Sequence, residues 1–193
     1  VKEPTDFNDL MSLEGLLEVK WQVEYGPARY HVYLQNGQYL GNIADQMIVY
    51  MDHFTRILTV ADTGLGKTGL LINEVAKHYS ERDYIIATPT TALAEQKAVV
   101  QPQEPSAEVI QYHVVKGGTR PNGDRIQFTT FDSLRKFPDV VIQNAVGAVD
   151  EIHQVASSMG YRAEAMRSMM AILDQCWKQI YVTSTPLPYL EYI

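Results

Sequence analysis

The chain has 193 residues, of which 46% are hydrophobic and 20% charged, which excludes a disordered, collagen-like or coiled-coil protein and favours one soluble folded domain with a small appendage. Its formal net charge of −7 excludes a broadly basic surface that coats nucleic acid, but this charge does not exclude a narrow basic groove. The single cysteine, Cys176, excludes an internal disulfide, and no apolar run reaches the length of a membrane span, so we expect a cytoplasmic protein without membrane contact.

Residues 1–40 differ in composition from the rest of the chain, because they are rich in Tyr, include Trp21 and hold no phosphate-binding residues. Apolar residues alternate strictly over 19–25, as in a half-buried strand, and 29–34 reads as the returning strand after a turn at 26–28. We therefore expect a small β-hairpin appendage here. The chain begins at Val1 rather than at methionine, which suggests a processed product or a segment of a longer protein.

From Ile43 onward, short apolar runs alternate with segments of helix length. This alternation predicts an α/β fold with a mostly parallel sheet and helices on both faces. Ligands of such sheets bind at the carboxyl ends of the strands. The expected strands are 57–60, 84–87, 109–112, 126–128, 145–149 and 179–183, and the expected helices include 70–76 and 91–100.

A glycine-rich stretch, Ala61-Asp62-Thr63-Gly64-Leu65-Gly66-Lys67-Thr68, lies directly between an expected strand and an expected helix. Its glycines allow backbone N–H groups to close around a phosphate chain, and the helix N-terminus adds a positive dipole end. Lys67 is suited to the β- and γ-phosphates, and the Thr68 hydroxyl to Mg²⁺. An ordinary turn with a surface lysine is the alternative, which the strand–loop–helix context disfavours. The expected nucleotide-binding residues are Thr63, Gly64, Leu65, Gly66, Lys67, Thr68 and Gly69.

Two adjacent carboxylates, Asp150 and Glu151, follow the apolar run 145–149 at what would be another strand end. Adjacent side chains at a strand end point in different directions, so one can serve a metal ion and the other a water molecule. We expect Asp150 to hold Mg²⁺ and Glu151 to act as general base, with Lys67 as the third catalytic residue. A solvated acidic turn is the alternative reading for the pair alone.

Asp150-Glu151-Ile152-His153 resembles the DExH box of superfamily 2 helicases and translocases, and 61–68 is similar to the phosphate-loop variant of that superfamily, alanine included. Further segments resemble its other motifs in the expected chain order. Ala87 to Gln96 resembles motif Ia, Gly117-Gly118 the double glycine, Thr129 to Leu134 motif Ib, and Thr183-Ser184-Thr185-Pro186 motif III, which is usually Ser-Ala-Thr.

This resemblance implies an amino-terminal RecA-like motor domain of the P-loop NTPase class that uses ATP and Mg²⁺ and binds one strand of nucleic acid. It implies that Gln46 reads adenine, and that His153, Thr183 and Thr185 couple the nucleotide site to the nucleic-acid track. The residues implied in nucleic-acid contact are Pro89, Thr90, Thr91, Gly117, Gly118, Thr129 and Thr130. Small hydroxyls and exposed N–H groups suit phosphate oxygens without reading sequence.

The resemblance also sets the expected domain organisation: an appendage over 1–40 and a first RecA-like domain over 41–193. Motors of this superfamily carry a second RecA-like domain, which supplies an arginine finger and which this chain lacks. We expect that domain in the same longer chain or in trans. An arginine finger contributes about 10³–10⁵ in rate, so the chain alone should bind nucleotide but hydrolyse it slowly.

Two other functions stay open at this stage. A phage packaging ATPase of the terminase type also pairs a phosphate loop with Asp-Glu, although the motif Ia resemblance disfavours it. A scaffold that binds ATP without motor activity is the second. The sequence does not separate DNA from RNA, although the short loops and the DExH rather than DEAD box favour DNA by analogy.

Overall fold

The structure is a computed structural model that describes residues 38–100 and 110–185. The β-hairpin expected over 19–34 lies outside these residues, so it stays a prediction. Within the described part, no helix has both the length and the apolar character that crossing a membrane requires.

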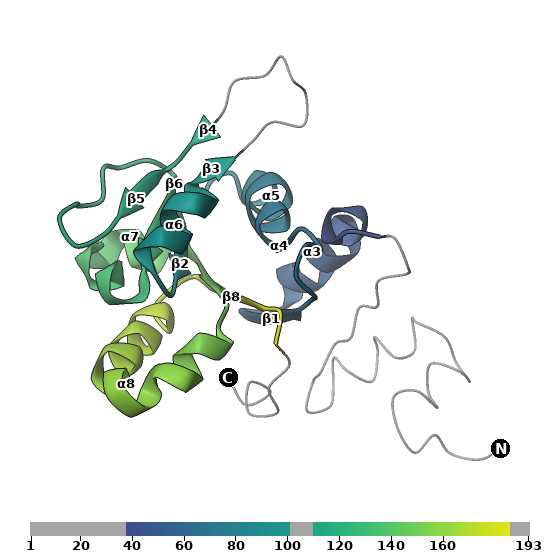
Figure 1. The fold of residues 1–193 in the computed structure, drawn as a ribbon. Coiled ribbons are helices and arrows are strands. Elements are labelled where there is room, and N and C mark those ends of the chain that lie inside the picture. The colour runs from purple at the N-terminus through teal and green to yellow at the C-terminus, as the bar shows by residue number, and fades with distance from the viewer. Residues whose placement is uncertain (1–37, 101–109, 186–193) are drawn as a thin grey trace. The chain divides into compact units, whose positions relative to one another are not determined.

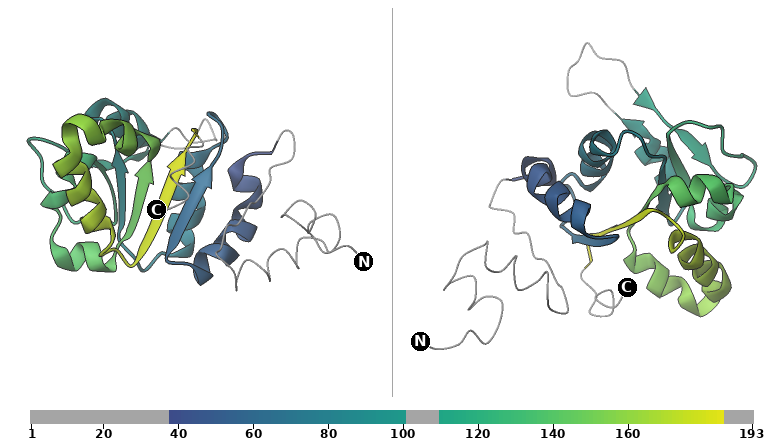
Figure 2. Two further views of the ribbon diagram at one scale, coloured as in Figure 1. Left: turned by 90° about the horizontal axis from the view of Figure 1, so that it is seen from below. Right: turned by 180° about the vertical axis from the view of Figure 1, so that it is seen from behind.

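A six-stranded sheet in the order β1-β8-β7-β2-β6-β5 forms the centre of the molecule, and every neighbouring pair in it is parallel. The predicted α/β class with a parallel sheet is thereby confirmed. Figure 2 shows β1 in blue beside β8 in yellow, and Arg56 at the start of β1 pairs with Gln179 of β8 although the two are far apart in sequence. The strand bounds are β1 Arg56–Val60, β2 Tyr84–Thr88, β5 His113–Val115, β6 Ile126–Thr130, β7 Val146–Asp150 and β8 Lys178–Thr183.

The central strands are continuous apolar runs because both of their faces are covered. All residues of β2, β6, β7 and β8 are buried, whereas the edge strand β1 is only partly so. Side chains alternate between the two faces of a strand. On β2, Ile85 and Ala87 belong to the core on one face, and the hydroxyl of Tyr84 donates to the carbonyl of Val75 on the other.

Helices cover both faces of the sheet (Figure 1). One face carries η3, α7 and α8, which enclose the core around Phe131 and Met166, and the other carries α6 and the helical segment 67–78. A π-helical stretch forms the middle of that segment, a local widening often found at functional sites. The bounds are η1 Leu40–Ile43, α3 Ala44–His53, α4 Lys67–Gly69, η2 Leu70–Val75, α5 Ala76–His78, α6 Thr91–Ala98, η3 Phe131–Lys136, α7 Asp139–Asn144 and α8 His153–Leu173.

The prediction for one strand is wrong. The run 109–112 was expected in the main sheet, but β4 (Ile110–Gln111) pairs antiparallel with β3 (Val99–Val100) in a separate two-stranded sheet. Helix α6 therefore ends at Ala98 instead of continuing to 100. Ile110 is 52% exposed, so this run is not a core strand, and β5 takes the edge of the main sheet instead.

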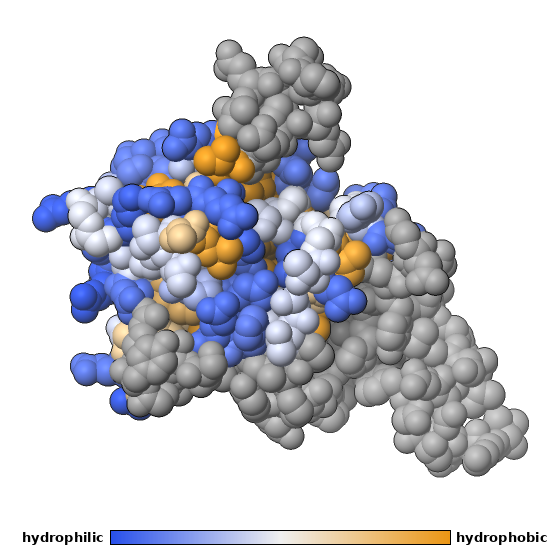
Figure 3. Space-filling view, viewed as in Figure 1, coloured by the Kyte–Doolittle hydropathy of each residue, from blue (hydrophilic) through white to orange (hydrophobic). Residues whose placement is uncertain are grey.

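The surface seen in Figure 3 is mostly hydrophilic, with separate apolar patches. Among the described residues, the exposed large apolar side chains belong to elements scattered through the chain, such as Val49 on α3, Ile110 on β4 and Val140 on α7. Scattered exposure of this kind is normal for a folded domain.

Candidate active site

The glycine-rich loop lies at the carboxyl end of β1 and leads directly into α4. Gly64 and Gly66 have φ angles of 87° and 84°, in the left-handed region that other residues rarely adopt, which explains glycine at both positions. The backbone N–H of Ala61 donates to the carbonyl of Thr183 over 3.0 Å, which ties the start of the loop to the end of β8. The loop is thus held between two adjacent strand ends.

Lys67 is buried at the base of this loop, with 7% of its surface exposed. Its ammonium donates to the carbonyls of Ala61 over 2.9 Å and of Asp62 over 3.1 Å. These bonds use two of the three N–H donors of a lysine. The side chain therefore holds the loop closed from inside and keeps a positive charge within it.

Asp150 ends β7 and is almost completely buried, at 1% exposure. Its Oδ2 forms an ion pair with Nζ of Lys97, which reaches it from α6. Its Oδ1 is one of only two buried side-chain oxygens or nitrogens in the described residues that lack a hydrogen-bond partner. A buried, unpaired carboxylate oxygen fits a ligand of Mg²⁺ or of a water molecule on it.

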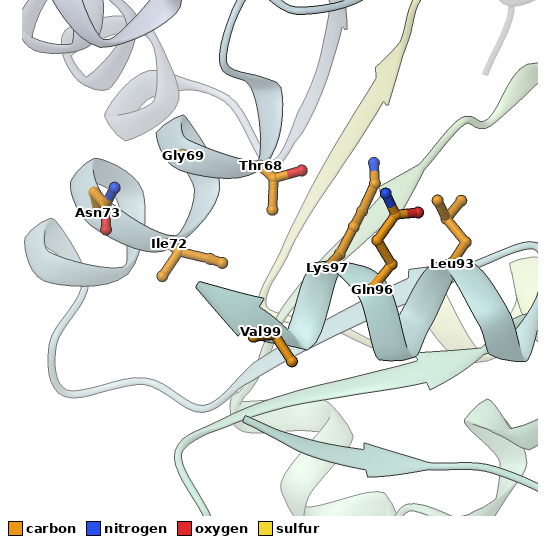
Figure 4. Close-up of a pocket in the computed structure, with 8 residues that line it drawn as sticks. All are labelled: Thr68, Gly69, Ile72, Asn73, Leu93, Gln96, Lys97 and Val99. Carbon is orange, nitrogen blue, oxygen red and sulfur yellow. The ribbon is translucent and has the colours of Figure 1, made fainter. Parts of the chain in front are cut away.

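Thr68, the other expected Mg²⁺ ligand, lines a pocket between α4 and α6 of about 330 Å³. Lys97 lines the same pocket, and Figure 4 shows its side chain extended from α6 with Thr68 on the opposite wall. Both expected ligands, Thr68 and Asp150, therefore lie around one lysine. The residues present fit a magnesium site, and Asp150 and Thr68 would hold the ion.

Glu151 has a φ angle of 55° and is the one non-glycine residue with positive φ that the described part of the chain contains. Strained backbone of this kind persists where surrounding contacts impose it, and it clusters at active sites. The contacts come from Ser184, whose backbone N–H and hydroxyl both donate to Oε2 of Glu151, over 3.3 Å and 3.2 Å. The carboxylate is thus held toward the end of β8.

His153 lies between Glu151 and the end of β8. Its Nδ1 is 2.8 Å from Oγ1 of Thr183 and 3.3 Å from Oε2 of Glu151. The same Thr183 oxygen accepts from the backbone N–H of Thr185 over 3.1 Å. The three residues expected to couple the two sites therefore form one connected group beside the expected general base, and their coupling role stays a prediction.

Gln46 lies on α3, exposed, and its adenine-reading role also stays a prediction. One observation bears on it: the N–H of Leu40, in the short helix just before α3, donates to the carbonyl of Leu65 over 3.0 Å. The segment that carries Gln46 is therefore anchored to the phosphate loop.

The residues expected to contact nucleic acid divide by exposure. Thr90, Thr91, Gly117 and Gly118 are exposed, although the Thr90 hydroxyl accepts from the N–H of Leu93 over 3.2 Å as the N-cap of α6. Pro89, Thr129 and Thr130 are buried.

The contact of Thr129 with nucleic acid stays a prediction, and the structure places this residue inside the fold. Its side chain has no exposed surface, and its hydroxyl donates to the carbonyl of Val115 over 3.1 Å. The alternation of side chains along β6 turns this hydroxyl toward the neighbouring strand β5.

Sequence reasoning overlooked three residues of this region. Lys97 pairs with Asp150, Ser184 binds Glu151, and Nζ of Lys136 donates to the carbonyls of Gly117 and Thr119 over 2.8 Å and 3.0 Å. Ser184 had a usable signal, since motif III usually has alanine at its position. The sequence signal for Lys97 was weaker: Lys97 follows Leu93 by four residues, so the two side chains share one face of helix α6.

A family model described as "Type III restriction enzyme, res subunit" matches residues 23–187. No curated protein matches the chain.

Solved structures share the fold at low identity. The SWI2/SNF2 ATPase core of Sulfolobus solfataricus in complex with dsDNA matches with a TM-score of 0.54 and 16% identity, over 86% of this chain and 35% of that one. UvsW of T4 matches with 0.50 and 17%, over 95% and 35%. The DUF1998 helicase MrfA bound to DNA and AMPPNP matches with 0.51 and 20%, over 75% and 24%. The chain thus spans about a third or less of the length of each.

Proposed function

The chain belongs to the family of the type III restriction enzyme res subunit and is therefore a superfamily 2 helicase-type ATPase motor domain. We propose that it couples ATP hydrolysis to movement along DNA or to the unwinding of DNA. The family match supports this function rather than that of a packaging ATPase of the terminase type.

The observation that carries the proposal is the pair of carboxylates at the end of β7. Asp150 is buried with one oxygen unpaired, and Glu151 is turned into the left-handed region and held by Ser184. Both lie at the carboxyl ends of the parallel strands, where the phosphate loop also begins, because β7 and β1 are the two neighbours of β8. A solvated acidic turn would show neither the burial of Asp150 nor the two donors from Ser184 to Glu151.

Each residue of the site has a separate role in the proposed ATP hydrolysis. Lys67 and the backbone N–H groups of the loop hold the phosphates, and Asp150 and Thr68 hold Mg²⁺, which when bound neutralises charge on the phosphate oxygens. Glu151 accepts the proton of the attacking water as general base.

Contacts around Glu151 fix the direction in which it acts. The hydrogen bonds from Ser184 and the neighbouring ring of His153 orient the carboxylate. Because His153 also binds Thr183, a change at the nucleotide reaches the end of β8 through direct contacts. We propose this group as the coupling between hydrolysis and the nucleic-acid track.

The exposed Thr91, Gly117 and Gly118 are the proposed contacts to the sugar-phosphate backbone. DNA as the substrate is supported by the family, described as a restriction enzyme, and by solved structures of this fold that hold DNA. A second RecA-like domain is what the resemblance to superfamily 2 motors implies, and this chain covers only 35% and 24% of those two structures. We propose that it completes the site.

The test is Mg²⁺-ATP hydrolysis by the longest natural polypeptide that contains this chain, with and without single-stranded DNA, duplex DNA and RNA. DNA should stimulate hydrolysis, and Glu151→Gln should remove the stimulation while nucleotide binding persists. Stimulation by RNA alone would overturn the choice of DNA.

Nucleotide binding without stimulation by any nucleic acid would overturn the motor itself and favour the ATP-binding scaffold. The isolated chain is the second arm of the test. Motor-like hydrolysis by the chain alone would show that no second domain is needed.

A further inference from the structure

Lys97 is a partly buried cation beside the expected magnesium ligand Asp150, and it lies outside every motif that the sequence showed. It lies on α6 and reaches Asp150 at the end of β7, 53 residues away, where its Nζ pairs with Oδ2. Its side chain is 18% exposed and that of Asp150 is 2% exposed. The pair is therefore largely removed from water.

The electrostatic surroundings of Lys97 are unusual for a lysine. Burial lowers its pKa, and the nearby charge of Lys67 lowers it too, whereas Glu151 raises it. The ammonium thus sits between a second lysine and two carboxylates. Of the two oxygens of Asp150, the lysine satisfies Oδ2, and Oδ1 has no hydrogen-bond partner among the described residues.

From this geometry we infer that Lys97 is a positioning residue that holds Asp150 while the magnesium site is empty, and that it competes with Mg²⁺ for that carboxylate. The inference rests on the proposed function, because it assigns Asp150 to Mg²⁺. A buried carboxylate that loses its only cation is strongly destabilised, so a resident lysine keeps Asp150 charged and in place.

Mg²⁺ bound at Oδ1 and the ammonium of Lys97 at Oδ2 would share one buried carboxylate and repel each other in a region of low dielectric constant, so we expect the lysine to move when the ion enters. The structure provides room for that movement. Lys97 already lines the pocket between α4 and α6, about 330 Å³, together with Thr68, Leu93 and Gln96 (Figure 4). A rotation of its flexible side chain into this pocket frees Oδ2.

Competition has a measurable consequence. Removing the charge with Lys97→Met should lower the Mg²⁺ concentration that half-saturates nucleotide binding by about tenfold, within the range typical of coupled binding events. Lys97→Gln should act in the same direction, and it retains a hydrogen-bond donor for Asp150 in case the methionine variant folds poorly. Lys97→Arg keeps the charge and should stay near the wild type.

The measurement is fluorescence of mant-AMPPNP, a labelled non-hydrolysable ATP analogue, bound to the longest natural polypeptide at fixed pH while Mg²⁺ is titrated from an EDTA baseline. Lys116→Met is the matched control. Like Lys97, Lys116 pairs with a carboxylate, but its partner is the exposed Glu95 of helix α6, outside the site. Thermal melting in EDTA gives a second readout. The Lys97→Met and Lys97→Gln variants should melt lower in EDTA and gain more from Mg²⁺ with nucleotide than the wild type.

Three results would overturn the inference. An unchanged or raised Mg²⁺ requirement in Lys97→Gln would show that the lysine does not compete. Weaker analogue binding in EDTA and also at saturating Mg²⁺ would make Lys97 a phosphate ligand instead. Failure of the wild type to bind the analogue at all would overturn the proposed function along with this inference, whereas normal binding without a Mg²⁺ shift overturns the inference alone.

Discussion

Ser184 binds Glu151 through two donors at once: its backbone N–H and its hydroxyl both reach Oε2, over 3.3 Å and 3.2 Å, across 33 residues of sequence. An alanine at this position, usual in the motif that 183–186 resembles, supplies only the backbone donor. The serine is therefore an addition of this chain to the hold on its expected general base.

Ser184→Ala should lower the kcat of DNA-stimulated ATP hydrolysis roughly three- to tenfold, which corresponds to the ~0.5–1.5 kcal/mol of one hydrogen bond. The KM for ATP should stay the same, because the lost bond orients the base and does not bind substrate. Ser80→Ala, at an exposed turn, is the control. Steady-state kinetics check the split, and an unchanged kcat would show that the backbone donor is enough.

Thr129 and Thr91 should separate stability from nucleic-acid binding. Thr129→Val removes the hydroxyl that donates to Val115, so it should lower the free energy of unfolding by ~1 kcal/mol and leave DNA affinity unchanged. Thr91→Ala, on the exposed first turn of α6, should weaken DNA binding with little effect on stability. Denaturant unfolding and fluorescence anisotropy measure the two effects. Weakened DNA binding in a fully folded Thr129→Val variant would contradict the structure.

Gly147 leaves no room for a side chain. A Cβ at this position in β7 would lie 2.7 Å from Sγ of Cys176 and 2.9 Å from Cδ2 of Leu173. Gly147→Ala should therefore lower the free energy of unfolding by about 1–3 kcal/mol, the usual cost of overpacking a core. Gly41→Ala, where a Cβ meets nothing within 4 Å, is the control in the same urea titration. Equal midpoints for the two variants would disprove close packing here.

Asp52 should give a pH-dependent contribution to stability. Burial acts to raise its pKa, but hydrogen bonds from Tyr79 and His78, together with the charges of His78 and Lys178, outweigh it, so the pKa is lowered. A lowered pKa in the folded state means that the carboxylate stabilises the fold above the unfolded value of about 3.9 and loses that effect as the pH falls through the folded value.

Asp52→Asn should therefore melt below the wild type at pH 7, and the gap should close as the pH falls below about 4. Thermal melts between pH 7 and pH 3 measure it. Asp45→Asn, on the first turn of the same helix, is the control. A gap that stays constant down to pH 3 would show that the charge of Asp52 plays no part.

The strands β1, β2, β6, β7 and β8 are predictable from local sequence to within two residues, and so are the places of the glycine-rich loop and of Asp150-Glu151 at strand ends. Each of these rests on a local signal: an apolar run that must be buried, glycines at positive φ, or polar side chains directly after a strand. The same local logic misplaced the run 109–112, because an apolar run of that length does not say which sheet it joins.

Contacts between residues that are distant in sequence could not be predicted in this way. Lys97 meets Asp150 across 53 residues and Ser184 meets Glu151 across 33, and both contacts follow from a strand order that puts β7 beside β8 and α6 over the sheet. The register of β6 likewise turned the hydroxyl of Thr129 inward. Strand order and register are set by packing of the whole core, so no local pattern of residues carries them.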